Sequence, residues 1–358
     1  MKSKMIFEEP LFLEDVSKVA SLNLPWDILK NKTLLVSGAT GLIGSFLIDV
    51  IMKRNMEYSM NCKVYALGRN LNKAEKRFGS LLNGSSLSFI PCDINKPLSE
   101  SGAPPVDYVL HLASNTHPVA YATDPIGTIM TNVIGTKNLL DFCVSHSVSR
   151  FLFASTVEVY GENRGDVDKF TEDYCGYIDC NTLRAGYPES KRCGEALCQA
   201  YIKQSGLDIV IPRFSRTYGP TMLMDDSKAI SQFILKAING NDIVLKSDGK
   251  QYYSFSYVAD AVSGLLTILL KGKCGEAYNI SDSSSDIHLK DLASLIAGYC
   301  KKRVVFELPD AVEQAGYSKA TNARLDSDKL QRLGWKADYS ISEGIQRTIT
   351  ILRDMINQ

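Results

Sequence analysis

The stretch TLLVSGATGLIG, residues 33–44, decides the fold. It opens with a short apolar run, Thr33–Ser37, which predicts a buried strand. Behind the glycines, apolar residues recur at helical spacing, at positions 43, 46, 47, 50 and 51. This order of strand, tight turn and helix predicts the first unit of a parallel α/β sheet.

The three glycines of this turn, Gly38, Gly41 and Gly44, have separate physical roles. One allows the tight turn, one lets backbone N–H groups approach a pyrophosphate, and one lets the helix pack closely on the sheet. The unpaired N–H groups at the start of the helix would face the phosphates. Glycines that only mark a turn are the alternative, but the strand before and the helix after favour a dinucleotide site. The expected contacts come from Gly38, Thr40, Gly41, Leu42, Ile43 and Gly44.

Five more apolar runs predict further strands of the same sheet. They lie at residues 63–67, 87–90, 108–112, 150–154 and 208–211, and helical stretches separate most of them. Buried strands that alternate with amphipathic helices predict a parallel sheet covered on both faces. The fold class is therefore α/β, a Rossmann doubly wound parallel sheet with a smaller, irregular α/β C-terminal lobe.

The pattern divides the chain into three parts. Residues 1–30 predict a polar N-terminal helical arm whose role the sequence does not indicate. Residues 31–212, with about 255–272, form the expected NAD(P)-binding Rossmann domain. Residues 213–254 and 273–358 are less regular and form the expected substrate-binding domain.

Composition excludes several classes of protein. Forty Lys and Arg residues balance forty Asp and Glu residues, so no nucleic-acid or membrane partner is expected. The nine cysteines and four histidines lack the spacing of metal ligands, so no metal is expected and the thiols are taken as reduced. The chain has no secretory signal pattern and no apolar stretch long enough for a bilayer. A soluble, cytoplasmic protein is expected.

The residues that follow the next strands bear on the choice of cofactor. NAD preference usually shows as a carboxylate at the end of the second strand, where this chain has Gly68 and Arg69. Arg69 could pair with a 2′-phosphate, so NADP is at least as probable as NAD, unless Arg69 is only a solvated surface residue. Asp93 and Ile94, after the third strand, are expected near the adenine. Three residues after the fourth strand complete the expected cofactor contacts: Leu112, Ala113 and Ser114.

Three polar side chains predict acid–base chemistry at this edge of the sheet. Tyr187 and Lys191 lie four residues apart and share one helix face, so the ammonium is expected to lower the pKa of the phenol. Thr156 ends the fifth strand and could hydrogen-bond the hydroxyl that Tyr187 deprotonates. A Tyr and a Lys at this spacing often occur by chance, but the glycine loop and the strand-end hydroxyl make the combination specific.

From about residue 32 to the C-terminus, the motifs TGATGLIG, HLAS, ASTVEVYG, YPESK and FSRTYGP resemble the extended short-chain dehydrogenase/reductase family, in its nucleotide-sugar epimerase/dehydratase branch. The resemblance implies that Tyr187 is the catalytic base, that Lys191 supports it and orients the nicotinamide ribose, and that Thr156 aligns the substrate. It further implies oxidation of the sugar at C4 to a 4-keto intermediate with bound NAD(P). A homodimer through the helices near 125–147 and 187–205 is also implied.

The chain is similar to UDP-glucuronate decarboxylases and 4-epimerases, with departures that bear on the reaction. Val157 stands where sugar 4,6-dehydratases have a proton-donating Asp and decarboxylases usually have Ser. Decarboxylases usually have an Arg where this chain has Tyr253, and Arg216 stands where relatives often have an Asn near the substrate diphosphate. Glu158 remains, either as a base for C5 chemistry or as a structural carboxylate.

Epimerisation at C4 needs the fewest groups, so a 4-epimerase is the first expectation. A UDP-glucuronate decarboxylase or 4,6-dehydratase is the alternative, followed by an NADPH-dependent keto-sugar reductase. A cofactor-sensing module without catalysis is the rival of another class. The substrate residues expected are Ser114, Thr156, Arg213, Arg216 and Tyr253.

Overall fold

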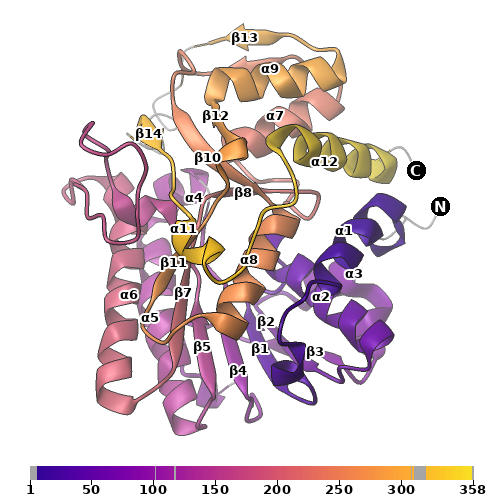
Figure 1. Ribbon diagram of the computed structural model, residues 1–358, viewed down its shortest axis with the longest axis vertical. Helices are drawn as coiled ribbons and strands as arrows, with labels where there is room; N and C mark the ends of the chain where they lie inside the picture. The colour runs from indigo at the N-terminus through magenta and orange to yellow at the C-terminus, as the bar shows by residue number, and fades with distance from the viewer. Residues whose placement is uncertain (1–5, 101, 117, 308, 310–319, 357–358) are drawn as a thin grey trace.

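An eight-stranded parallel sheet organises the computed structural model, which describes residues 6–100, 102–116, 118–307, 309 and 320–356 (Figure 1). The strands run in the order β11-β7-β5-β4-β1-β2-β3, and β6 pairs with β7. Their bounds are β1 Thr33–Ser37, β2 Lys63–Gly68, β3 Leu87–Pro91, β4 Tyr108–His111, β5 Arg150–Phe153, β6 Ser155–Thr156, β7 Ile209–Phe214 and β11 Ala277–Ile280. The Rossmann fold class expected from the sequence is confirmed.

The point where the strand order reverses lies between β1 and β4. Ser37, the last residue of β1, pairs with Leu67 of β2 on one side and with His111 of β4 on the other. The chain leaves β1 for β2 on one side, and after β3 it crosses back to β4 on the other side, so the loops separate above this edge. In open α/β sheets, ligands bind in the crevice at such a point.

Helices cover both faces of the sheet (Figure 1). They are α2 Leu42–Tyr58, α3 Leu71–Phe78, α4 Pro118–Thr123, α5 Pro125–Ser145, α6 Gly186–Ser205 and α8 Val258–Lys271. Because strand side chains alternate between faces, Leu34 and Val36 of β1 join the core with α2 and α8, whereas Leu35 joins the core with α5 and α6. Both faces are therefore apolar, as a doubly wound sheet requires.

A second lobe lies beyond the carboxyl edge of the large sheet (Figure 1). Its strands are β8 Arg216–Tyr218, β9 Ile243–Leu245, β10 Tyr252–Tyr257, β12 Asp286–His288, β13 Val304–Phe306 and β14 Asn322–Ala323. Its helices are α7 Ala229–Ile238, α9 Leu289–Cys300, α11 Asp328–Gln331 and α12 Ile341–Ile356. The structure places β11 in the large sheet beside β7, although the sequence pattern assigned residues 273–358 to the substrate-binding domain. The short 3₁₀ segments are η1 Ile6–Glu8, η2 Trp26–Leu29, η3 Gly79–Asn83, η4 Leu98–Glu100, η5 Val157–Tyr160, η6 Leu183–Ala185 and η7 Ser283–Ser285.

The N-terminal arm is a packed helix, α1 Pro10–Ala20, which lies against α2, α8 and α12. Its Asp15 is fully buried and accepts hydrogen bonds from Tyr257 at 2.5 Å and Tyr339 at 2.7 Å. Nε of Arg347, on α12, lies 2.7 Å from the Asp15 carboxylate. The arm therefore joins the cofactor helix of the first lobe to the last helix of the second.

None of the helices in the described ranges is long and apolar enough to cross a membrane.

Asp260, on α8, is expected to make the stability of the protein depend on pH. It is buried and accepts hydrogen bonds from the backbone N–H groups of Asp338 and Tyr339, and burial raises its pKa from 3.8 to about 7. Between these values the folded state binds more protons than the unfolded state, so the free energy of unfolding falls as pH rises. We expect chemical denaturation of Asp260→Asn to show a shallower fall between pH 5 and 7. The control Asp354→Asn, at an exposed position on α12, should keep the original slope, and an unchanged slope in Asp260→Asn would contradict the assignment.

Candidate active site

The glycine turn between β1 and α2 has the shape that a bound pyrophosphate needs. Gly38 has φ +71°, and a Cβ there would stand 2.7 Å from the backbone nitrogen of Ala113. A Cβ on Gly44 would collide with the carbonyl oxygen of Gly38. The N-cap of α2 is Gly41, which has no side chain to accept hydrogen bonds from the N–H groups of the first turn. These N–H groups are therefore not covered by a cap side chain. Together with Thr40, Leu42 and Ile43, the glycines therefore fit the phosphates of a dinucleotide.

The other predicted cofactor residues follow the carboxyl ends of neighbouring strands. Arg69 is exposed directly after β2, Asp93 and Ile94 follow β3, and Leu112–Ser114 follow β4. The backbone N–H of Ala113 donates to the Ser37 hydroxyl at 3.3 Å, which ties the β4 loop to the end of β1. The structure thus brings these residues to one edge of the sheet, beside the glycine turn.

A chain of hydrogen bonds connects this edge to α6. The Ser114 hydroxyl donates to the side-chain oxygen of Asn132 at 2.7 Å. The side-chain nitrogen of Asn132 in turn donates to the hydroxyl of Ser190 at 2.9 Å. Ser190 lies one turn after Tyr187, so the predicted cofactor and catalytic residues occupy one connected site.

The three predicted catalytic groups lie together on β6 and α6. Tyr187 stands in the first turn of α6 and is buried, and its hydroxyl hydrogen-bonds the side chain of Thr156. Lys191 follows one helical turn later, and its ammonium donates to the carbonyl oxygen of Ala154 at 2.8 Å. Tyr121, on α4, stacks on the Tyr187 ring with 4.7 Å between centroids. The Tyr187 side chain is therefore contacted at its ring by Tyr121 and at its hydroxyl by Thr156.

The prediction that the pKa of Tyr187 would be lowered is wrong for this structure. Burial raises the pKa of Tyr187 to about 12 and outweighs the hydrogen bond from Thr156 and the charge of Arg184. Burial also lowers the pKa of Lys191 to about 8. The spacing in the sequence indicated that the two side chains share a helix face, but it did not indicate that both are buried. Burial disfavours the charged form of each group, which explains both shifts in pKa.

Glu158 lies between two arginines. The Arg184 guanidinium donates to the Glu158 carboxylate at 2.6 Å, and Nη2 of Arg216 lies 3.6 Å from its other oxygen. These two charges lower the pKa of Glu158 although burial opposes them. A carboxylate stabilised in this way is a weak base.

Arg216 connects this cluster to Tyr253. Strands β8 and β10 pair in parallel, and the Arg216 guanidinium lies 3.5 Å above the Tyr253 ring. The Tyr253 hydroxyl donates to the carbonyl oxygen of Ala320 at 2.7 Å, which fixes the ring. Two predicted substrate residues, Arg216 and Tyr253, are thus in direct contact with each other, and Arg216 also contacts Glu158, one of the predicted catalytic residues.

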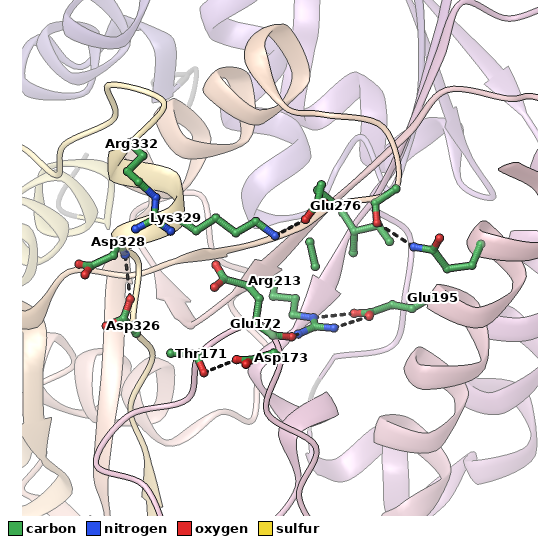
Figure 2. Close-up of a pocket in the computed structure, with 14 residues that line it drawn as sticks. Thr171, Glu172, Asp173, Glu195, Arg213, Glu276, Asp326, Asp328, Lys329 and Arg332 are labelled. Carbon is green, nitrogen blue, oxygen red and sulfur yellow. Dashed lines mark hydrogen bonds and ion pairs between the residues drawn. The ribbon is translucent and has the colours of Figure 1, made fainter.

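Arg213 lies outside this cluster. Its guanidinium donates to both oxygens of Glu195, to the Tyr160 hydroxyl and to the backbone carbonyl of Glu172. It lines a separate pocket of about 580 Å³ in which Glu195, Glu276 and Lys329 also point inward (Figure 2). Arg213 makes no hydrogen bond or ion pair with Tyr187 or Glu158, so the structure does not bring it together with the other predicted substrate residues.

Two contact residues of the site were not found from the sequence. Arg184 stands three residues before Tyr187, and η6 leads directly into α6, so its proximity to the motif was a usable signal. Tyr121 lies far from the motif in the chain and carries no comparable signal. Within the described residues, no group of His, Cys, Asp and Glu side chains could hold a metal ion.

Comparisons with known proteins agree with this geometry. The sequence model of the NAD dependent epimerase/dehydratase family matches residues 34–281. UDP-glucuronic acid decarboxylase 1 from Danio rerio is 33% identical over 320 residues, which cover 89% of this chain and 72% of that protein.

Two solved structures share the fold. A UDP-glucuronic acid 4-epimerase from Bacillus cereus, in complex with UDP-glucuronic acid and NAD, superposes with a TM-score of 0.76 at 24% identity, over 90% of this chain and 99% of that one. A dTDP-glucose 4,6-dehydratase from Streptomyces venezuelae with NAD bound gives 0.78 at 24% identity, over 90% and 97%. The chain therefore belongs to the NAD-dependent epimerase/dehydratase family and is an NAD(P)-dependent enzyme that modifies nucleotide-sugars.

Proposed function

We propose that this enzyme is a nucleotide-sugar 4-epimerase that works through a 4-keto intermediate. The observation that carries the proposal is the contact between Tyr187 and Thr156 beside the glycine turn, with Lys191 one turn further along α6. This arrangement provides a positioned acid–base group at the carboxyl edge of the sheet, where ligands bind in this fold.

The side chains of the site have distinct tasks in this reaction. Thr156 and Tyr187 hydrogen-bond the C4 hydroxyl, and Tyr187 takes its proton as C4 is oxidised. This step needs the phenolate, and the positive charge that an oxidised nicotinamide would bring to the site would lower the pKa of Tyr187, which burial raises to about 12. A bound nicotinamide would supply the hydride acceptor and donor for C4. Tyr121 keeps the Tyr187 ring in place by stacking. Lys191, held by the Ala154 carbonyl, positions the ribose and supplies positive charge near the phenol.

Two features favour epimerisation over elimination of water. Val157 cannot protonate a leaving hydroxyl group, and Glu158 is an ion-paired carboxylate of lowered pKa, which makes it a poor base for the C5 proton. Decarboxylation is the second candidate, because relatives about one-third identical to this chain are named UDP-glucuronic acid decarboxylases. A stoichiometric NADPH-dependent reductase is a third candidate, which Arg69 favours.

The reaction is tested by incubating the purified protein with UDP-, dTDP-, GDP- and CDP-hexoses and UDP-glucuronate, each with NAD or NADP. Products are followed by NMR and mass spectrometry. An isomer of unchanged mass supports the 4-epimerase, whereas loss of carbon dioxide or water assigns the enzyme to the decarboxylase or dehydratase reaction. In a parallel incubation with NADPH and a nucleotide-linked 4-keto-sugar, net consumption of NADPH would establish the reductase.

The cofactor preference is expected to depend on Arg69. Its exposed guanidinium follows β2 at the position of the adenosine ribose and could form charge-assisted hydrogen bonds with a 2′-phosphate. We expect Arg69→Ala to weaken NADP binding by about tenfold or more, since such a bond contributes about 1.5–3 kcal/mol, and to leave NAD binding unchanged. Titration calorimetry with both cofactors checks this. Equal losses for NAD and NADP, or no loss, would refute the role of Arg69.

We further propose that the enzyme acts in the cytoplasm as a homodimer through α5 and α6. Apolar side chains of α5 support an interface, since Ile126 is 74% exposed and Ile129 and Met130 are also exposed. Light scattering of the purified protein at micromolar concentration distinguishes the dimer from a monomer.

A further inference from the structure

The groups proposed to act on the C4 hydroxyl come from two separate elements. Thr156 stands on β6, a strand of two residues, whereas Tyr187 and Lys191 stand on α6. A hydroxyl and a phenol share a proton only while they stay within hydrogen-bonding distance. The backbone of β6 pairs with β7, so its separation from α6 depends on side-chain contacts between the two elements.

One carboxylate on α6 makes such a contact with β6. Glu195 lies one helical turn after Lys191, and its Oε1 accepts a hydrogen bond from the Ser155 hydroxyl at 2.5 Å. Ser155 directly precedes Thr156 and is buried, with 4% of its surface exposed. The hydrogen bond therefore joins α6 to β6 at the residue next to Thr156.

Arg213, on β7, holds the Glu195 carboxylate in place (Figure 2). Its Nε donates to Oε1 at 2.9 Å and its Nη2 donates to Oε2 at 2.6 Å, so the guanidinium binds both oxygens. Its Nη1 donates to the Tyr160 hydroxyl at 2.9 Å and to the Glu172 carbonyl oxygen at 2.7 Å. A two-point pair of this kind fixes the direction of the carboxylate as well as its distance. The side chains of Glu195 and Arg213 are only 15% and 12% exposed, so little water competes with these bonds.

We propose that Glu195 is a positioning residue for the C4 oxidation. Through Ser155 it holds Thr156 within hydrogen-bonding distance of Tyr187. The inference rests on the proposed function, because it assigns a task in the same proton transfer. It also gives Arg213 a place in the site, as the group that orients Glu195 and not as a ligand of the sugar. Glu195 acts through its neighbours and exchanges no proton with the substrate.

Ser155→Ala is the sharpest variant, because it removes the hydroxyl that reaches Glu195 and leaves the pair of Glu195 with Arg213 intact. Ser263→Ala is its matched control. Ser263 lies on α8 and is equally buried, at 4% exposed, and its hydroxyl accepts a hydrogen bond from Trp335 at 2.8 Å. Each variant loses one buried hydroxyl, so we expect similar losses of stability in thermal denaturation.

Turnover distinguishes a positioning role from a merely structural one. We expect Ser155→Ala to lower kcat by about tenfold to 10²-fold, because a small displacement of Thr156 misaligns the proton transfer. Its affinity for NAD and NADP, measured by titration calorimetry, should match that of the wild type, since the glycine turn keeps its contacts. Ser263→Ala should keep wild-type kcat despite its loss of stability.

Glu195→Gln tests the same connection from the side of α6. The amide keeps one oxygen acceptor but presents an NH₂ group to Arg213 in place of the other, so one of the paired bonds is lost. We expect kcat to fall here too, with unchanged cofactor affinity. Glu276→Gln is the control, because Glu276 faces the same pocket and is ion-paired with Lys329 (Figure 2). It should keep wild-type turnover.

A signal from the phenol itself makes the test independent of turnover. In protein labelled with carbon-13 at the tyrosine Cζ, the Tyr187 resonance is the one missing from Tyr187→Phe, and its frequency depends on the hydrogen bonds of the hydroxyl. We expect Ser155→Ala to shift this resonance and Ser263→Ala to leave it in place. An unshifted resonance in Ser155→Ala, or a kcat no lower than that of Ser263→Ala, overturns the inference. If the wild type converted no nucleotide-sugar, the proposed function would fail, and the Tyr187 resonance alone would decide the role of Glu195.

Discussion

Replacing Tyr187 with phenylalanine is expected to lower kcat by about 10²–10⁴-fold while the fold and cofactor binding persist. The substitution removes only the hydroxyl that exchanges a proton with the C4 oxygen. The ring stays buried and keeps its stacking contact with Tyr121, so the helix start should not move. Turnover is followed by NMR with the nucleotide-sugar that the incubations described above show to be converted. Folding is checked by circular dichroism and thermal denaturation.

Tyr58→Phe is the matched control, because its ring is about half exposed and lies at the last residue of α2. It should keep wild-type turnover. If Tyr187→Phe were as active as the wild type, the acid–base assignment would fail. If the wild type and Tyr187→Phe both failed to alter any nucleotide-sugar, yet both bound the cofactor, the non-catalytic sensing module would become the better description.

Replacing Gly44 with alanine is expected to weaken cofactor binding by about 5- to 150-fold, which corresponds to the roughly 1–3 kcal/mol typical of overpacking. The new Cβ would collide with the Gly38 carbonyl oxygen, so the turn must move away from α2. That movement displaces the N–H groups that the phosphates would meet. Titration with NAD and NADP measures the loss, and thermal denaturation measures the accompanying loss of stability.

Gly298→Ala provides the comparison within the same chain. Gly298 lies inside α9, and an added Cβ meets nothing within 4 Å. We expect a gain in stability of about 0.5–1 kcal/mol and unchanged cofactor affinity. Wild-type cofactor affinity in Gly44→Ala would show that the phosphates do not bind at the start of α2.

The sequence predicted the elements of the large sheet closely because its strands are buried on both faces. Thr33–Ser37 matches the structure at both ends, and the predicted strand at 87–90 lies within β3 Leu87–Pro91. The sequence pattern placed residues 277–280 in the substrate-binding domain, whereas the structure pairs them, as β11, with β7 of the large sheet. This pairing joins residues about 65 positions apart in the chain, which no local pattern encodes. The motif residues Thr156, Tyr187 and Lys191 were found because their order and spacing are specific.

What the sequence could not supply is the environment of those residues. The pKa of Tyr187 is set by burial, which spacing alone does not reveal. Glu158 could be seen as a base or as a structural carboxylate, and only its contacts with Arg184 and Arg216 favour the second description. Arg213 was a plausible substrate ligand until its bonds to Glu195 and Tyr160 were seen.

The buried Asp15 on the N-terminal helix bears on how shortened forms of this protein should be made. The recognisable motifs begin near residue 32, which makes that position an obvious place to start a truncated chain. Such a chain would leave Arg347, only 17% exposed, without its buried carboxylate, and would leave the hydroxyls of Tyr257 and Tyr339 without an acceptor. A buried cation that loses its partner destabilises a protein strongly. The arm is thus part of the folding unit, and shortened versions should retain residues from Glu9 onward, where the carboxylate caps α1.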